Sequence, residues 1–292
     1  PHLADWLKID PASQNGNYLV NVIFFSVNFI AVALIFRPFL LDSLAPVKER
    51  RLGWFFLPVG IAYGLCAVTS NLITVIYEIL QVTPENLNNE AVGSMLTAHP
   101  AAMLLFTVVL APIYEECLFR GVLFTPFCKK CPWVGYVLSV LLFSGIHVVN
   151  AIGMQSPVEL ILCFVQYVPL SLFLCWACQK TRSIWGSITL HALINGISCL
   201  FMLLDSAAGQ AGGLLVGADG EIIAAKAGLI EQEPRYEKSG EQIHRADGEG
   251  SRPEEQVVAV LVMLSFALSF ACGRLPGIAS LSDGTRTILL TG

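Results

Sequence analysis

Two adjacent glutamates and an arginine stand in a stretch that is otherwise apolar enough for a membrane. The stretch APIYEECLFRGVLF, residues 111–124, contains Glu115, Glu116 and Arg120. A charged side chain at the middle of a bilayer costs on the order of 2.5–3.5 kcal/mol on insertion scales, so such residues usually face a protein interior or a water-filled cavity. A carboxylate held in such a place can act as a general base. The stretch therefore predicts a functional site within the membrane.

The spacing of the three charges separates their roles. Glu116 and Arg120 are four residues apart, so they share one helix face and can form an ion pair. Glu115 points about 100° away around the same axis. Pro112 lacks a backbone donor and is expected to kink the helix one turn earlier, which would open space near Glu115. One carboxylate can thus be neutralised while its neighbour stays free for chemistry; the alternative is that all three charges form a purely structural ion cluster.

Two later stretches carry further polar groups at helical spacing. FSGIHVVN supplies Phe143 and His147, and HALINGIS supplies His191 and Asn195. A single histidine of this kind can be structural, and an asparagine can hydrogen-bond between helices. With a rise of about 1.5 Å per residue, however, the polar groups fall at overlapping depths when measured from the expected cytoplasmic ends of their helices. We therefore expect these residues to meet Glu115 in one site.

The composition of the chain predicts membrane helices, and these helices must position the residues named above. The chain of 292 residues is 55% hydrophobic and 13% charged, with a mean hydropathy of +0.66, whereas a soluble domain is roughly a quarter charged. A membrane-spanning helix needs about 20 mostly apolar residues. Segments that come close lie at 18–36, 54–80, 101–127, 133–150, 157–178, 184–204 and 257–273. The predicted fold is all-α, a polytopic transmembrane bundle of about seven spans with one polar extramembrane loop.

The chain is expected to divide into three regions. Residues 1–204 hold membrane helices 1–6, with the catalytic core at about 100–200. Residues 205–256 form a polar external loop, in which Asp219-Gly220 favours a hairpin and the polar stretch that follows is predicted to be disordered. Residues 257–292 hold the last membrane helix and the C-terminal tail.

Lysine and arginine gather in the first, third and fifth loops between these spans. Cytoplasmic loops collect basic residues, so we expect an integral multi-pass membrane protein with its N-terminus outside and its C-terminus in the cytoplasm. A bacterial plasma membrane is the expected location. No basic tract suggests nucleic acid as a partner, and membrane lipids are the expected surroundings.

Together the motifs resemble those of the CPBP intramembrane protease family, which includes the type II CAAX prenyl endopeptidases and the bacterial Abi-type proteins. The resemblance covers about residues 100 to 200. It rests on three motifs in order on successive membrane helices: EExxxR (Glu115, Glu116, Arg120), FxxxH (Phe143, His147) and HxxxN (His191, Asn195).

The resemblance implies an endopeptidase that hydrolyses a peptide bond inside an all-α membrane fold. Glu115 and His147 would activate a water molecule for attack on the scissile carbonyl. His191 and Asn195 would donate hydrogen bonds to the developing oxyanion. The implied partner is a membrane-associated peptide or a lipid-modified protein, and prenylated proteins are one substrate class among several.

The sequence leaves the cofactor open. Glu115, His147 and His191 would satisfy a three-ligand catalytic zinc site with an open position for water. There is no HExxH motif in the chain. A metal-free, glutamate-activated water and a zinc-bound water are therefore both possible, and no other cofactor is expected.

Other features could carry different chemistry. The CxxC pairs Cys128/Cys131 and Cys175/Cys178 could bind structural zinc or form a redox pair. Cys117, Ser144 or Ser187 could act as a nucleophile, although no GxSxG elbow is present. A non-enzymatic transporter or an immunity or binding protein is the alternative of another class, but transporters commonly show repeated halves, and this chain shows no internal repeat.

Overall fold

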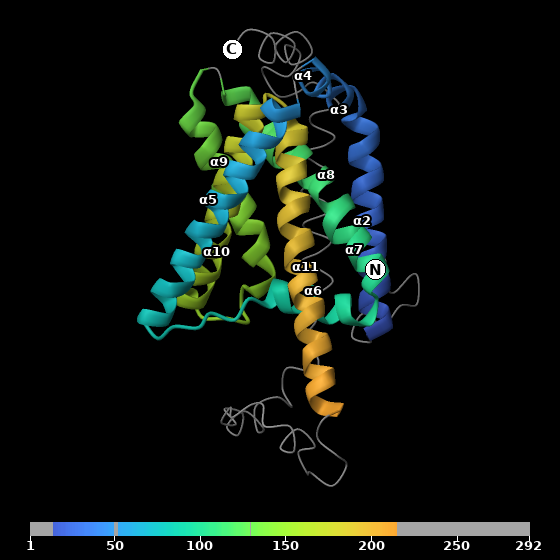
Figure 1. Ribbon diagram of the computed structural model, residues 1–292, viewed down its shortest axis with the longest axis vertical. Coiled ribbons are helices and arrows are strands. Elements are labelled where there is room, and N and C mark those ends of the chain that lie inside the picture. The colour runs from blue at the N-terminus through green and yellow to red at the C-terminus, as the bar shows by residue number, and fades with distance from the viewer. Residues whose placement is uncertain (1–13, 50–51, 129, 215–292) are drawn as a thin grey trace.

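The fold is an all-α bundle whose long helices lie side by side along one axis (Figure 1). The computed structural model describes residues 14–49, 52–128 and 130–214. The long helices are α2 (Gln14–Ile35), α5 (Leu52–Ile79), α9 (Pro132–Val148), α10 (Pro157–Thr181) and α11 (Ile184–Leu214). Shorter helices connect them: α3 (Arg37–Asp42), α4 (Ala45–Glu49), α6 (Leu87–Ala98) and η4 (Val149–Ala151).

The predicted all-α membrane bundle is confirmed for the described part of the chain. Six helical segments there are long and apolar enough to cross a membrane: Tyr18–Ile35, Gly53–Ile79, Pro100–Phe127, Pro132–Ala151, Pro157–Thr181 and Ile184–Ala207. The expected seventh span at 257–273, the hairpin at Asp219-Gly220 and the disordered stretch after it lie outside the described residues. Helix α11 continues to Leu214, so its end lies beyond the boundary expected at residue 204.

The third span is a composite of short pieces. It consists of α7 (Pro100–Leu104), the π-helix η1 (Leu105–Leu110), α8 (Ala111–Glu116), the π-helix η2 (Cys117–Phe124) and the 3₁₀ turn η3 (Thr125–Phe127). π-Helical turns occur mostly as local bulges within α-helices, and often at functional sites. Here they flank the short α-helical segment that carries both glutamates.

Pro112 explains part of this irregularity. In η1 the backbone N–H of Ala111 donates to the carbonyl of Phe106, five residues earlier. In that register the next carbonyl, on Thr107, would be paired with residue 112, and proline has no N–H to donate. The side-chain amide of Asn195 donates to this carbonyl instead, at 2.9 Å. The site of the expected kink is therefore a π-helical segment whose free carbonyl is satisfied from α11.

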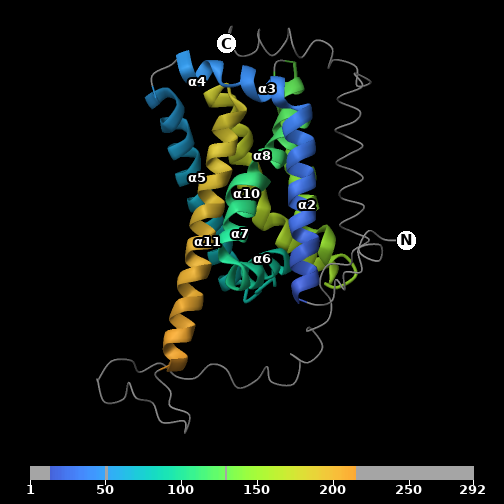
Figure 2. The same ribbon diagram turned by 90° about the vertical axis from the view of Figure 1, so that its right-hand side faces the viewer.

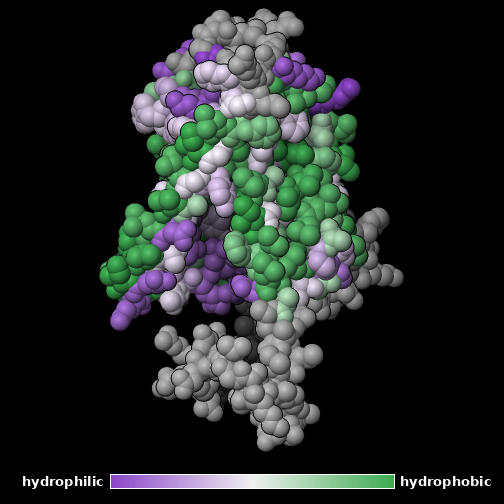
Figure 3. Space-filling view, in the orientation of Figure 1, coloured by the Kyte–Doolittle hydropathy of each residue, from purple (hydrophilic) through white to green (hydrophobic). Residues whose placement is uncertain are grey.

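Helix α10 is central to the packing, since it contacts α5, α9 and α11. The ends of the bundle differ: α3 and α4 lie at one end, and α6 lies at the other (Figure 2). Apolar side chains cover much of the outer surface between these ends (Figure 3). Exposed leucine, isoleucine and valine residues on α5 and α11 are expected in a helix that faces lipid.

Gly135 lies where α9 packs closely against the end of the third span. A Cβ atom at this position would lie 3.0 Å from the carbonyl oxygen of Phe124 and 3.2 Å from Cβ of Phe127, whereas Gly145 on the same helix has no such neighbour within 4 Å. We predict that Gly135→Val destabilises the detergent-solubilised protein by about 1–3 kcal/mol, the usual cost of overpacking. Gly145→Val is the matched control and should change stability much less. Equal unfolding midpoints for the two variants in thermal denaturation would contradict the packing described here.

Candidate active site

A buried ion pair forms the base of the site. Both Glu116 and Arg120 have fully buried side chains, and Nη1 of Arg120 lies 3.0 Å from Oε1 of Glu116. Nη2 of Arg120 also donates to the backbone and the hydroxyl oxygen of Ser171 on α10, at 3.1 and 3.0 Å. Its guanidinium carbon lies 4.5 Å from the ring centre of Phe143 on α9, close enough for a cation–π interaction. The pair predicted from i,i+4 spacing is thus present, and it connects the third span to two other helices.

His191 joins this cluster from α11. Its Nδ1 lies 2.9 Å from the same Glu116 oxygen that Arg120 contacts. A carboxylate paired with an arginine can only accept hydrogen bonds, so Nδ1 of His191 carries the hydrogen. The opposite ring nitrogen, Nε2, is then turned toward Glu115, at 3.9 Å from Oε2.

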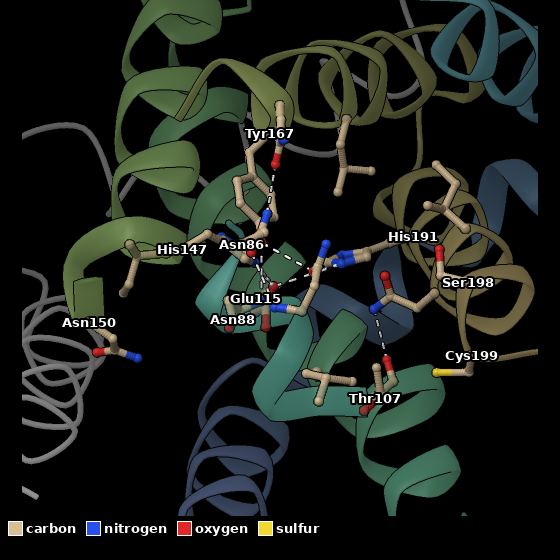
Figure 4. A pocket seen from close by; sticks show the side chains of 18 of the residues that line it. Asn86, Asn88, Thr107, Glu115, His147, Asn150, Tyr167, His191, Ser198 and Cys199 are labelled. Atoms are coloured by element: carbon tan, nitrogen blue, oxygen red, sulfur yellow. Dashed lines mark hydrogen bonds and ion pairs between the residues drawn. The ribbon is translucent and has the colours of Figure 1, made fainter. Parts of the chain in front are cut away.

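His147 approaches Glu115 from α9 in the same way. Its Nδ1 lies 2.8 Å from the carbonyl oxygen of Phe143, which fixes the hydrogen on Nδ1 because a carbonyl only accepts. Its Nε2 lies 4.0 Å from Oε2 of Glu115. Figure 4 shows Glu115 between the two histidines. The neighbouring glutamates therefore have different surroundings, although they adjoin in sequence.

Glu115 and His147 border the cavity with partly exposed side chains. The side chains of Glu115 and His147 are 14% and 15% exposed, whereas Glu116 is fully buried. Oε2 of Glu115 forms no hydrogen bond with any described residue. Two polar atoms about 4 Å apart are too distant to bond each other, but both can hold one water oxygen at about 2.8 Å. Because Oε2 of Glu115 is itself buried in this structure, a water shared by the carboxylate and the imidazoles requires a small shift of these side chains.

This group lies on the wall of a cavity of about 480 Å³. The cavity also contacts residues of α2, α5, α6, α10 and α11, so it lies within the bundle. Side-chain amides make up much of its polar lining: Asn21, Asn86, Asn88, Asn89, Asn150, Gln166 and Asn195. A volume of this size accommodates a short stretch of peptide or a small molecule.

Sequence reasoning missed Tyr167 and its asparagine partners. The Tyr167 ring packs on His147 with 4.5 Å between ring centres. Its hydroxyl donates to Oδ1 of Asn86 at 3.0 Å and accepts from Nδ2 of Asn88 at 3.2 Å. These contacts support the His147 ring from α10. The polar run ENLNNE at residues 85–90, placed between two predicted spans, was the available signal in the sequence.

Asn195 lines the cavity, but one of its two amide hydrogens is engaged by the carbonyl of Thr107. Its expected role as an oxyanion donor therefore depends on the second hydrogen. His191 is the better placed donor when it is protonated, because its Nε2 faces Glu115 directly. The alternative nucleophiles Cys117, Ser144 and Ser187 do not line the cavity.

Glu115, His147 and His191 are residue types that bind zinc, but the distances between their ligand atoms are longer than a zinc site requires. Both histidines bond through Nδ1 and leave Nε2 free, and hydrogen bonds to the far nitrogen commonly orient histidines that bind a metal in this way. The ligands of a tetrahedral zinc with bonds of about 2.0–2.1 Å lie roughly 3.4 Å apart, while Glu115 is 3.9 and 4.0 Å from the two rings. Among the described side chains, no group of three or more His, Cys, Asp and Glu residues is arranged to hold a metal ion.

The cysteine pairs lie away from the cavity. Cys128, Cys175 and Cys178 pack together with Phe124 in an apolar cluster. Burial raises the pKa of Cys128 to about 12, so this thiol stays protonated near neutral pH. Because metals and disulfide exchange require the thiolate, this arrangement favours ordinary packing for these residues.

Comparison with known proteins finds a family model and two relatives that resemble this part of the chain. Residues 97–197 match the family model described as type II CAAX prenyl endopeptidase Rce1-like, which confirms the resemblance inferred from the three motifs. The chain is 29% identical to the UPF0177 protein YbdI of Lactococcus lactis over 188 residues, which cover 63% of this chain and 92% of that protein. It is 33% identical to the UPF0177 protein YbdJ of the same organism over 90 residues, which cover 31% and 34% of the two chains. No solved structure matches the chain significantly.

The buried ion pair yields a stability prediction. Arg120→Ala leaves the Glu116 carboxylate without its cation in a dry interior, and breaking a buried pair in this way typically costs about 3–5 kcal/mol. We expect the variant to unfold at a much lower temperature or denaturant concentration in detergent. Arg37→Ala, which removes an exposed arginine at the bundle end, is the matched control. A variant Arg120→Ala as stable as this control would show that the pair does not support the fold.

Proposed function

We propose that the protein is an intramembrane endopeptidase that hydrolyses peptide bonds of membrane-associated or lipid-modified peptides and proteins. The observation that carries this proposal is the convergence of Glu115 Oε2 with Nε2 of His147 and His191, at 4.0 and 3.9 Å, on the wall of a cavity between membrane spans. The match of residues 97–197 to the Rce1-like family supports protease activity of this general kind.

In the proposed reaction, Glu115 and His147 hold the attacking water. Glu115 takes one proton from it as the oxygen adds to the scissile carbonyl carbon. When the tetrahedral intermediate collapses, the C–N bond breaks and Glu115 returns this proton to the leaving nitrogen. General acid–base catalysis of this kind contributes about 10²–10⁴ in rate.

The oxyanion is stabilised from α11. His191 in its protonated form donates from Nε2, and the Glu116 carboxylate at its Nδ1 stabilises the positive charge on the ring. The remaining amide hydrogen of Asn195 is the second proposed donor. Each such donor can be worth about 10²–10³ in rate. Arg120 acts through Glu116 and is a positioning residue in this scheme.

A zinc-dependent version of the same hydrolysis is the alternative. The Nδ1 partners of both histidines favour it, because they leave the two Nε2 atoms free to bind a metal together with Glu115. A bound zinc ion would supply Lewis-acid activation of the water. The separations near 4 Å favour the metal-free scheme.

We place the protein in a bacterial plasma membrane, surrounded by lipid, with its N-terminus outside and its C-terminus in the cytoplasm. The Lactococcus relatives support the bacterial origin. The basic residues at the α3–α4 end of the bundle support the orientation.

Replacement of Glu115 tests the proposed function. Glu115→Gln removes the base with little change in shape, so cleavage should fall by at least about 10² while the protein remains folded and inserted. The assay follows membrane-associated peptides that accumulate in cells carrying the variant, and their cleavage by the purified protein. Glu90→Gln, at an exposed position outside the cavity lining, is the matched control. A folded Glu115→Gln protein with undiminished cleavage would overturn the proposal, and a retained cellular phenotype without any cleavage would favour a binding protein or transporter.

Metal removal separates the two versions of the chemistry. Because the carboxylate and imidazoles can hold the water by themselves, we expect proteolysis to persist after exhaustive chelation. Peptide cleavage is measured before chelation, after it and after zinc is added back. Complete loss that zinc restores would overturn the assignment of Glu115 as a metal-free base.

A further inference from the structure

The cavity runs from Glu115 toward one end of the bundle only. Its lining includes Asn86 in the connection between α5 and α6, Asn88 in the first turn of α6, and Asn150 in η4. None of its lining residues comes from 36–53, 125–132 or 179–184, the connections at the α3–α4 end. Figure 3 shows a hydrophilic hollow in the half of the molecule toward α6, between apolar flanks.

The opposite side of the site is closed by packed side chains. The rings of Phe119 and Phe143 meet edge to face with 5.2 Å between their centres. The buried Arg120 lies against Phe143, and its partner Glu116 is also fully buried. A polypeptide therefore reaches Glu115 from the α6 end.

The two ends of the bundle differ sharply in charge. The α3–α4 end and the connections beside it hold the basic residues Arg37, Lys48, Lys130, Lys180 and Arg182. At the α6 end, the described residues 14–24, 76–104, 149–165 and 200–214 contain no lysine or arginine. Since basic residues collect on the cytoplasmic side, the cavity opens on the extracytoplasmic side.

The lining also indicates which part of a polypeptide would bind. Side-chain amides each offer a donor and an acceptor, which match the N–H and C=O groups of an extended peptide backbone. The cavity lining among the described residues has no lysine or arginine, and its one carboxylate is Glu115. A free C-terminal carboxylate close to the scissile bond would meet that like charge without a lysine or arginine beside it, while a protonated His191 is committed to the oxyanion in the proposed reaction; this arrangement is unfavourable.

The flanks of the hollow suit a substrate that is anchored in the membrane. Large apolar side chains are exposed on α5, including Val68 and Leu72, and on α11, including Leu200 and Leu204. An apolar anchor can lie in the lipid beside these helices while the polar segment next to it enters the cavity.

Building on the proposed peptidase activity, we propose that the scissile bond lies in an uncharged interior segment of a membrane-anchored polypeptide that enters from the extracytoplasmic side. The substrate is thus defined by an anchored, extended backbone and not by a carboxyl terminus presented from the cytoplasm.

Cysteine labelling tests the direction of the opening without relying on activity. Met154→Cys places a thiol in the exposed connection between α9 and α10 at the α6 end, and Lys180→Cys places one at the exposed basic end. A membrane-impermeant maleimide should label the first variant in intact cells and the second only after permeabilisation, with the parent chain as the background. The reverse pattern would overturn the inference.

Cleavage from each side of sealed membranes tests the substrate class. The probe is a mixture of palmitoylated dodecapeptides of uncharged residues with amidated C-termini, offered to spheroplasts, to inverted vesicles and to the detergent-solubilised full chain. We expect cleavage in spheroplasts and detergent that Glu115→Gln abolishes, and little in inverted vesicles. A matched mixture ending in a free carboxylate three residues after the scissile position should be cleaved at least about tenfold more slowly.

The outcomes separate this inference from the function on which it rests. Cleavage in detergent and in inverted vesicles, but not in spheroplasts, would overturn the side of entry and leave the peptidase function standing. Equal rates for the amidated and free-acid mixtures would overturn the preference for interior segments. No Glu115-dependent cleavage in detergent would overturn the peptidase function and this inference together.

Discussion

The constraint on which the site depends is the burial of the Glu116 carboxylate between membrane spans. An ionised group without partners is costly in such an interior, and removal of one partner typically costs several kcal/mol. Here the same oxygen of Glu116 accepts from Arg120 at 3.0 Å and from His191 at 2.9 Å. Because Arg120 also bonds to Ser171, satisfying this one charge fixes the third span, α10 and α11 relative to one another.

This arrangement gives different surroundings to two glutamates that are adjacent in sequence. Glu116 is committed to the ion cluster, so it cannot serve as a base. Glu115 lines the cavity, where Oε2 lies about 4 Å from both imidazoles and has no hydrogen bond within the described structure. His191 belongs to both environments, with Nδ1 on the structural cluster and Nε2 on the reactive side. In the proposed reaction, this ring would therefore donate toward the oxyanion while Glu116 supports its opposite nitrogen.

Much of the site could be predicted from the sequence because helical spacing is local. The i,i+4 relation of Glu116 and Arg120 predicts their contact, and the same relation places Phe143 beside His147, with 4.5 Å between ring centres. The partner of Asn195 could not be predicted in this way. It bonds to Thr107 because a π-helical register brings that carbonyl opposite Pro112, and such a register depends on packing between helices. Tyr167 was missed for a similar reason, since its contact with His147 joins α10 to α9 across the cavity.

The sequence by itself determined the composition of the membrane core, the spans and the residue types that could carry out hydrolysis. These follow from local rules: about 20 apolar residues are needed to cross a bilayer, and a charge within such a stretch requires a partner. The tertiary structure alone decided that His191 joins the Glu116 ion pair, which nitrogen of each histidine faces Glu115, and toward which end the cavity opens. Those features depend on how separate helices tilt and pack, and side-chain spacing along one helix carries no information about that arrangement.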